Sequence, residues 1–179
     1  MDLSPADPKC HDSTRDFAPD RLVIEASRGL KPGRALDLAC GTGRNALWLA
    51  EQGWQVTAVD INDQAIEILN AEARCRGLAI ETDAIDLEKD RFTIVPQTWD
   101  LILTCRYFQR DLLGPARDGV KSGGRMAAIV LLEAPGKTSV FRAKPGELRS
   151  YFLGWKILRD HEEQGVEPHY TAEVLAQKP

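Results

Sequence analysis

Apolar runs of strand length alternate along the chain with stretches whose apolar positions recur at helical spacing. The pattern predicts strands at residues 34–38, 55–60, 78–82, 99–104 and 125–132. It predicts helices at residues 19–30, 44–52, 63–76 and 107–120, with Asn62 as the N-cap of the third helix and Gly77 as its end. Because strands that alternate with helices form a parallel sheet covered on both faces, we expect an α/β protein.

The alternation of strands and helices stops near residue 144. A short helix at 145–152 precedes two strand-like runs, 156–163 and 170–177, which a polar turn joins into an antiparallel hairpin. The first 18 residues are rich in Asp, Pro, Ser and Lys and have no apolar pattern of their own. The sequence therefore predicts a flexible N-terminal segment at 1–18 and a single domain at 19–179.

Composition and charge narrow the classes of partner. The 179 residues are 43% hydrophobic and carry a net charge of −4, whereas proteins that bind phosphate backbones need clustered Lys and Arg. We expect neither a nucleic-acid partner nor a membrane partner, because no window is apolar enough to span a bilayer. The first residues lack the pattern of a signal peptide, so we expect a cytoplasmic location. The sequence does not indicate the oligomeric state.

The cysteines and histidines are scattered. Cys10, Cys40, Cys75 and Cys105 form no CxxC pair, a distribution that predicts reduced thiols. The three histidines stand singly, with no carboxylate or thiol at metal-ligand spacing. We therefore expect no protein-bound metal.

A glycine turn between the first strand and its helix is the clearest candidate for chemistry. Such a turn lets a ligand approach the backbone, and Gly41 and Gly43 occupy it. Asp60 ends the next strand, where a carboxylate accepts hydrogen bonds from ribose hydroxyls. The bare pattern Gly41-x-Gly43-x-x-Ala46 also fits NAD-binding proteins. Asp37, inside the first strand, instead favours a cationic ligand that bears an amino-acid group.

The run Leu36-Asp37-Leu38-Ala39-Cys40-Gly41-Thr42-Gly43 resembles motif I of the class I methyltransferases that use S-adenosylmethionine (SAM) and release S-adenosylhomocysteine (SAH). The resemblance implies a Rossmann-like, doubly wound, mostly parallel seven-stranded sheet with a C-terminal antiparallel hairpin. In this family the acid and the glycine loop hold the methionine part of SAM, and the acid that matches Asp60 binds the ribose.

Adenine contacts in the family come from residues just after the third strand, which are either Asp83 with Ala84 or Asp86 with Leu87. The sequence does not decide between these pairs. The complete set of cofactor-binding residues that the resemblance implies is Asp37, Ala39, Gly41, Gly43, Arg44, Asn45, Asp60, Ile61, Asp83, Ala84, Asp86, Leu87 and Cys105. For Arg44 and Asn45, a purely structural role at the start of the helix fits the residues equally well.

A closer resemblance is to the tellurite-resistance (TehB type) branch, which is similar to thiopurine methyltransferases and other small-molecule enzymes. Residues 43–46 with 56–60, residues 86–88 and residues 144–155 carry it. The gap between the fifth strand and the hairpin is short, which leaves little room for a large recognition domain. We therefore expect a small-molecule methyl acceptor.

Residues 104–107 stand where this family places the groups that line the methyl-transfer site. Arg106 and Tyr107 are the candidate catalytic residues, the first to meet an anionic substrate and the second to cover the sulfonium. Helical spacing places Arg110 on the same side as both. The sequence shows no general base, which favours a soft nucleophile such as a thiol or a tellurium or selenium oxyanion.

Two other functions fit parts of the pattern. A SAM-binding regulatory or scaffold protein would keep the cofactor site without methyl transfer, and the scarcity of aromatic residues before Trp48 favours it. An NAD-dependent oxidoreductase would share the glycine turn, but Asp37 and the terminal hairpin count against it.

Overall fold

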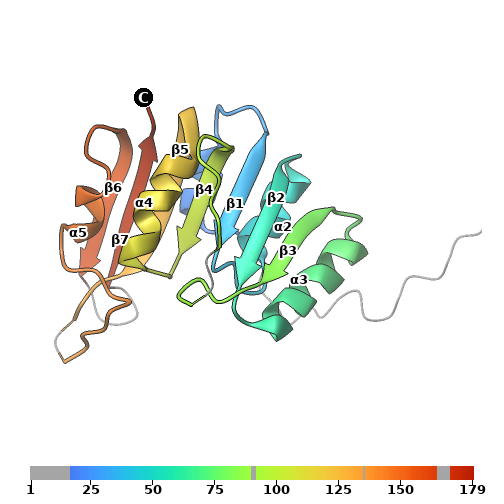
Figure 1. Cartoon of the computed structure of the whole chain (residues 1–179), viewed down its shortest axis with the longest axis horizontal. Helices are drawn as coiled ribbons and strands as arrows, with labels where there is room; N and C mark the ends of the chain where they lie inside the picture. The colour runs from blue at the N-terminus through green and yellow to red at the C-terminus, as the bar shows by residue number, and fades with distance from the viewer. Residues whose placement is uncertain (1–16, 90–91, 135, 165–169) are drawn as a thin grey trace, which may run out of the picture.

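Within residues 17–89, 92–134, 136–164 and 170–179, which the structure describes, seven strands form one sheet in the computed structural model (Figure 1). The strands are β1 (Arg34–Leu38), β2 (Gln55–Asp60), β3 (Ile80–Ala84), β4 (Trp99–Cys105), β5 (Val120–Leu131), β6 (Lys156–Gln164) and β7 (Tyr170–Gln177). The helices are α1 (Arg21–Ser27), α2 (Arg44–Glu51), α3 (Asp63–Cys75), α4 (Arg110–Gly119) and α5 (Glu147–Ser150). The predicted N-terminal segment 1–18 falls almost wholly outside these residues.

The strand order is β3-β2-β1-β4-β5-β7-β6. The first five strands pair in parallel, and β7 is antiparallel to both β5 and β6. The predicted doubly wound sheet with a C-terminal antiparallel hairpin is confirmed. The winding reverses direction between β1 and β4, and ligands of open α/β sheets bind outside the carboxyl ends of the strands at such a point.

Helices cover the two faces of the sheet through separate apolar clusters. Leu22 of α1, Leu47 of α2 and Leu69 of α3 are buried together on one face. Leu113 of α4 and Leu148 of α5 belong to the cluster on the other face. In Figure 1, α4 lies over β5 and α3 lies beside β3. Burial on both faces explains why the central strands are nearly continuous apolar runs.

Local signals fixed both ends of α3, whereas several other element boundaries differ from the prediction by two residues or more. The Asn62 side chain accepts hydrogen bonds from the amides of Gln64 and Ala65, and Gly77 follows α3 with a φ of 67°, so both predicted ends of this helix are confirmed. The third strand begins at Ile80, two residues later than predicted, and β5 begins at Val120 rather than 125.

A further difference concerns the helix predicted at 107–120, which begins only at Arg110 because Gln109 has an extended backbone. Tyr107 therefore lies in the loop that precedes α4. The expected placement of Arg106, Tyr107 and Arg110 on one helical side is wrong for the same reason.

The prediction of four reduced cysteines is also wrong, because Cys75 is disulfide-bonded. Its position near the end of α3 gave no signal of this, since pairing depends on distance in space. Cys40 and Cys105 have free thiols. No helix among the described residues is long and apolar enough to cross a membrane.

Candidate functional site

The glycine turn lies at the carboxyl ends of β1, β2 and β4, which meet at one edge of the sheet. Leu38 pairs with Val59 of β2 on one side and with Thr104 of β4 on the other. Immediately beyond, Ala39 has a φ of 57°, a left-handed conformation that is uncommon outside glycine. Gly41 and Gly43 continue the turn with φ values of 57° and 81°. A strained backbone at this edge is typical of a ligand-binding site.

Asp60 connects the end of β2 to this turn. One carboxylate oxygen accepts a hydrogen bond from the Gly41 amide at 2.7 Å, and the other accepts one from the Asn62 amide at 2.9 Å. A carboxylate has about four acceptor positions, so two stay open for a ligand. The carboxylate is thus held in place while it can still accept hydroxyl donors.

Asp37 is the buried acid of the site, with 1% of its surface exposed. The pKa of Asp37 is raised to about 7, mainly by burial and also by the carboxylates of Asp20 and Asp60, while Arg44 and the Ala46 amide oppose the shift. Its Oδ2 atom has no hydrogen-bond partner among the described residues. A buried oxygen without a partner is costly, so this carboxyl is suited to a cationic or donor group on a ligand.

Asp20, which the sequence analysis missed, joins three parts of the site. Its carboxylate accepts hydrogen bonds from Arg44 at 2.6 Å, from Asn45 at 3.2 Å and from Arg106 at 2.9 and 3.1 Å. Its amide donates to the Asn45 side chain at 2.9 Å. No local motif marks Asp20, because its partners are far from it in sequence. The roles of Arg44 and Asn45 are therefore at least partly structural.

The loop after β4 carries Arg106 and Tyr107. Arg106 has a φ of 62°, and about half of its side chain is exposed. The Thr104 hydroxyl donates to the Tyr107 carbonyl at 2.8 Å, which fixes the loop. The Tyr107 hydroxyl donates to Gln109 at 2.6 Å. Both predicted catalytic side chains thus lie at the same edge of the sheet as Asp37 and Asp60.

Two cavities open along this edge. The first, which we call the glycine-turn cavity, has a volume of about 320 Å³ and is lined by Asp37, Ala39, Cys40, Gly41, Thr42, Arg44, Asn45, Cys105 and Arg106. The second, the Asp60 cavity, has a volume of about 180 Å³ and is lined by Ala39, Asp60, Ile61, Ile85, Asp86, Leu87, Glu88 and Tyr107. The shared residue Ala39 joins them.

Most of the predicted site residues line one of these two cavities. Asp86 and Leu87 line the Asp60 cavity, whereas Asp83 and Ala84 belong to β3 and line neither. Gly43 also lines neither cavity: it is the N-cap of α2, and a Cβ atom there would collide with Leu69. Cys40, Thr42, Ile85 and Glu88 line the cavities but were not among the predicted site residues.

The two thiols at the site are not activated nucleophiles. Burial raises the pKa of Cys40 and of Cys105, and the carboxylate of Asp37 adds to the effect at both. Thiols kept protonated in this way react slowly. Among the described residues, no group of three or more His, Cys, Asp or Glu side chains could hold a metal ion.

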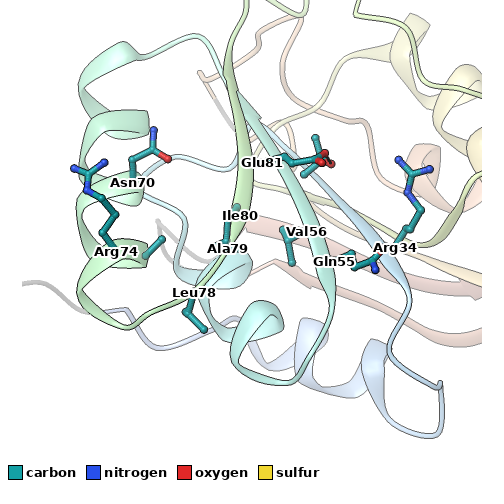
Figure 2. A pocket seen from close by; sticks show the side chains of 11 residues that line it. Arg34, Gln55, Val56, Asn70, Arg74, Leu78, Ala79, Ile80 and Glu81 are labelled. Carbon is teal, nitrogen blue, oxygen red and sulfur yellow. Dashed lines mark hydrogen bonds between the residues drawn. The ribbon is translucent and has the colours of Figure 1, made fainter. Parts of the chain in front are cut away.

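A larger cavity, of about 620 Å³, lies at the opposite ends of the same strands (Figure 2). It is lined by Arg34 and Gln55, which begin β1 and β2, and by Asn70 and Arg74 of α3. None of the predicted site residues lines it. The glycine-turn and Asp60 cavities therefore define the candidate site despite their smaller volumes.

The fold defines a class of protein: a doubly wound α/β protein whose candidate ligand site lies at the switch between β1 and β4. The family model of tellurite resistance protein TehB matches residues 12–174, and the chain belongs to this family. The predicted TehB resemblance is confirmed.

Individual relatives are similar over most of this chain. The probable S-adenosyl-L-methionine-dependent methyltransferase TehB of Haemophilus influenzae is 28% identical over 162 residues, covering 84% of this chain and 55% of that protein. Ribosomal RNA small subunit methyltransferase C of Alcanivorax borkumensis is 28% identical over 127 residues, covering 64% of this chain and 38% of that protein.

Among solved structures, the crystal structure of TehB from Haemophilus influenzae has a TM-score of 0.77 at 24% identity, covering 88% of this chain and 61% of that one. This likeness supports the fold. The chain spans about half the length of the curated relatives it matches.

Proposed function

We propose that this chain is a SAM-dependent methyltransferase that acts on a small-molecule acceptor. The observation that carries the proposal is the buried Asp37 carboxyl, whose Oδ2 lacks a partner at the edge of the glycine-turn cavity. The ammonium group of a methionine moiety supplies the charge and the donors that this oxygen lacks. An NAD cofactor has no such group to offer.

The two joined cavities suit the two halves of such a cofactor. The methionine half would occupy the glycine-turn cavity, where Asp37, Gly41 and Thr42 line the wall. The ribose hydroxyls would donate to the open positions on Asp60. The adenine would lie against Ile61, Ile85 and Leu87, because these apolar side chains line the Asp60 cavity.

Bound SAM would supply an activated methyl group, so the protein mainly has to hold the acceptor at attack distance. Tyr107 lines the Asp60 cavity, where its ring is suited to stabilise a sulfonium cation. Arg106 is tied to Asp20, and this pairing fixes the loop that faces the reacting groups. In this mechanism Tyr107 positions the sulfonium group and Arg106 holds the loop beside it. No general base is required for an acceptor that is already a soft nucleophile.

The charges of the site favour a thiol over a tellurium or selenium oxyanion. Arg44 and Arg106 are the cationic residues that line the glycine-turn cavity, and both pair with Asp20. An oxyanion would have to compete with that carboxylate for them. The net charge of −4 likewise gives no support to an RNA acceptor.

Calorimetric titration with SAH and with NAD tests cofactor binding. We expect SAH to bind and NAD to give no heat. Absence of heat with SAH at high protein concentration would refute the proposal.

Turnover separates an enzyme from a SAM-binding regulatory or scaffold protein. The measurement is SAH release with a panel of thiols, selenite, tellurite and small phenols. Release with at least one acceptor is expected, whereas binding of SAM without release for any acceptor would favour the scaffold.

A further inference from the structure

A third cavity, of about 340 Å³, adjoins the proposed cofactor site and takes no part in it; we call it the Phe141 cavity. It shares Glu88 with the Asp60 cavity. The start of α4 and the loop after β5 supply the rest of its wall, including Asp111 and Phe141. Its volume lies in the range of small-molecule sites.

Tyr107 connects this cavity with the Asp60 cavity, because it lines the Asp60 cavity and its ring packs on Phe141. Its ring stacks on Phe141 with a centroid separation of 6.3 Å and an interplanar angle of 27°. Its hydroxyl is held by Gln109, which in turn donates to the Leu87 carbonyl at 3.1 Å. A molecule in the Phe141 cavity would therefore lie next to the aromatic group that borders the cofactor.

Arg110 also lines the Phe141 cavity, but its charge is already neutralised. The guanidinium forms a bidentate ion pair with the Glu147 carboxylate, with N–O distances of 2.7 and 2.9 Å. It also donates hydrogen bonds to the carbonyl of Val140 at 2.7 Å and to the carbonyl of Arg142 at 3.1 Å. Arg110 therefore clamps the loop that carries Phe141. It is not available to an anionic substrate.

The remaining charged residues in the wall are acidic. Glu88 and Asp111 are exposed carboxylates that line the Phe141 cavity. The pKa of Tyr107 is raised to about 12, mainly by burial and in addition by the carboxylates of Glu88, Asp86 and Asp111. The charges of these carboxylates therefore act on this side chain. The rim is apolar, since Val140 is 72% exposed and Phe141 is 40% exposed.

We propose that the Phe141 cavity is the acceptor site, and that it selects small thiols with an apolar body and a neutral or positive second group over anionic acceptors. The inference rests on the proposed methyl transfer and adds the place and the charge of the acceptor. The apolar body contacts Val140 and Phe141, while a cationic group lies near Glu88 and Asp111 and the aromatic pair.

The chemistry of this step balances without a further reactant. The thiol loses its proton to water, and a sulfur lone pair forms the new bond to the methyl carbon. The electron pair of the broken carbon–sulfur bond stays on the donor sulfur, which becomes the neutral thioether of SAH. The positive charge of the sulfonium is thereby lost, and one proton is released.

The test is calorimetric binding to the protein saturated with SAH, a complex in which no turnover occurs. The probes are dimethylaminoethanethiol, isoamyl thiol and mercaptopropionate, which are similar in shape and are cationic, neutral and anionic. We expect the first two to bind and mercaptopropionate to bind weakest. In the double variant Glu88→Gln, Asp111→Asn, the affinity ratio of the cationic to the anionic thiol should fall about tenfold.

Two further variants make the test specific. The control is the double variant Glu67→Gln, Asp118→Asn, which removes two exposed carboxylates on α3 and α4 that line none of the four cavities. It should leave the affinity ratio of the cationic to the anionic thiol unchanged. Phe141→Ala should weaken the binding of isoamyl thiol at unchanged SAH affinity, because this side chain is 40% exposed and lines neither of the proposed cofactor cavities.

Failure of SAH to bind would count against the proposed function itself. If SAH binds, the inference about the acceptor is overturned by stronger binding of mercaptopropionate than of the cationic thiol. It is equally overturned if the ratio is unchanged in the double variant, or if none of the thiols binds.

Discussion

Asp20 and Arg106 lie 86 residues apart in sequence, yet both Asp20 carboxylate oxygens accept hydrogen bonds from the Arg106 guanidinium, at 2.9 and 3.1 Å. The same carboxylate binds Arg44 at the start of α2. The residue before α1 therefore holds the loop after β4 and the glycine-turn helix together. This contact closes one wall of the proposed methionine site.

Replacing Asp20 with Ala should destabilise the protein by about 1–3 kcal/mol, because a largely buried carboxylate with charged partners is lost. The free energy of unfolding in urea measures the effect. Asp118→Ala, at an exposed position of α4, should change it by less than about 0.5 kcal/mol. Equal stability of the Asp20 variant and the wild type would show that the network does not stabilise the fold.

Asp37 should make the stability of the free protein depend on pH. Its pKa is raised from 3.8 to about 7, so between these values the folded state holds a proton that the unfolded state has lost. Stability should therefore fall as pH rises from about 4 to 7, by up to about 4 kcal/mol. Asp37→Asn removes this titration, and its unfolding free energy should vary less across the same window. If the unfolding free energies of the wild type and of Asp37→Asn changed equally with pH, the raised pKa would not belong to Asp37.

Cofactor binding should release a proton from the same residue. Below pH 7 the free protein carries a protonated Asp37, whereas the ammonium group of SAM or SAH stabilises the carboxylate. Calorimetry at pH 6 in buffers of different ionisation enthalpy measures the number released, which should approach one in the wild type and be smaller in Asp37→Asn. Proton uptake on binding would exclude this pairing.

Asp60→Ala should weaken SAH binding by about 10- to 100-fold, because two hydrogen bonds from ribose hydroxyls to a charged group are lost. The Gly41 amide also loses its acceptor, so part of the effect will come from the turn itself. Asp60→Asn keeps one oxygen acceptor and should have an intermediate affinity. Unchanged affinity in the alanine variant, measured by calorimetry, would remove Asp60 from the site.

Gly43→Ala should be more destabilising than the matched substitution Gly53→Ala at the other end of the same helix. Both residues have positive φ, at 81° and 87°, but only at Gly43 would the new Cβ collide with Leu69. The excess cost should be about 1–3 kcal/mol in unfolding free energy. Equal costs would mean that the Leu69 side chain moves aside without penalty.

Sequence alone determined the elements whose causes are local. The Asn62 cap, the end of α3 at Gly77, the glycine turn and the terminal hairpin all follow from spacing and residue type. Asp37 and Asp60 were also found in this way, since the ends of consecutive parallel strands come to one edge of a sheet.

Tertiary structure decided the rest, because those features depend on distance in space. Strand β3 stays paired with β2 as far as Ala84, so Asp83 and Ala84 are part of the sheet. The residues that line the Asp60 cavity are therefore Asp86 and Leu87, which follow the strand. The ion pairs of Asp20 with Arg44 and Arg106 and the ion pair of Arg110 with Glu147 join segments far apart along the chain. No periodicity of apolar positions encodes such contacts, since they arise only when the packed sheet brings the segments together.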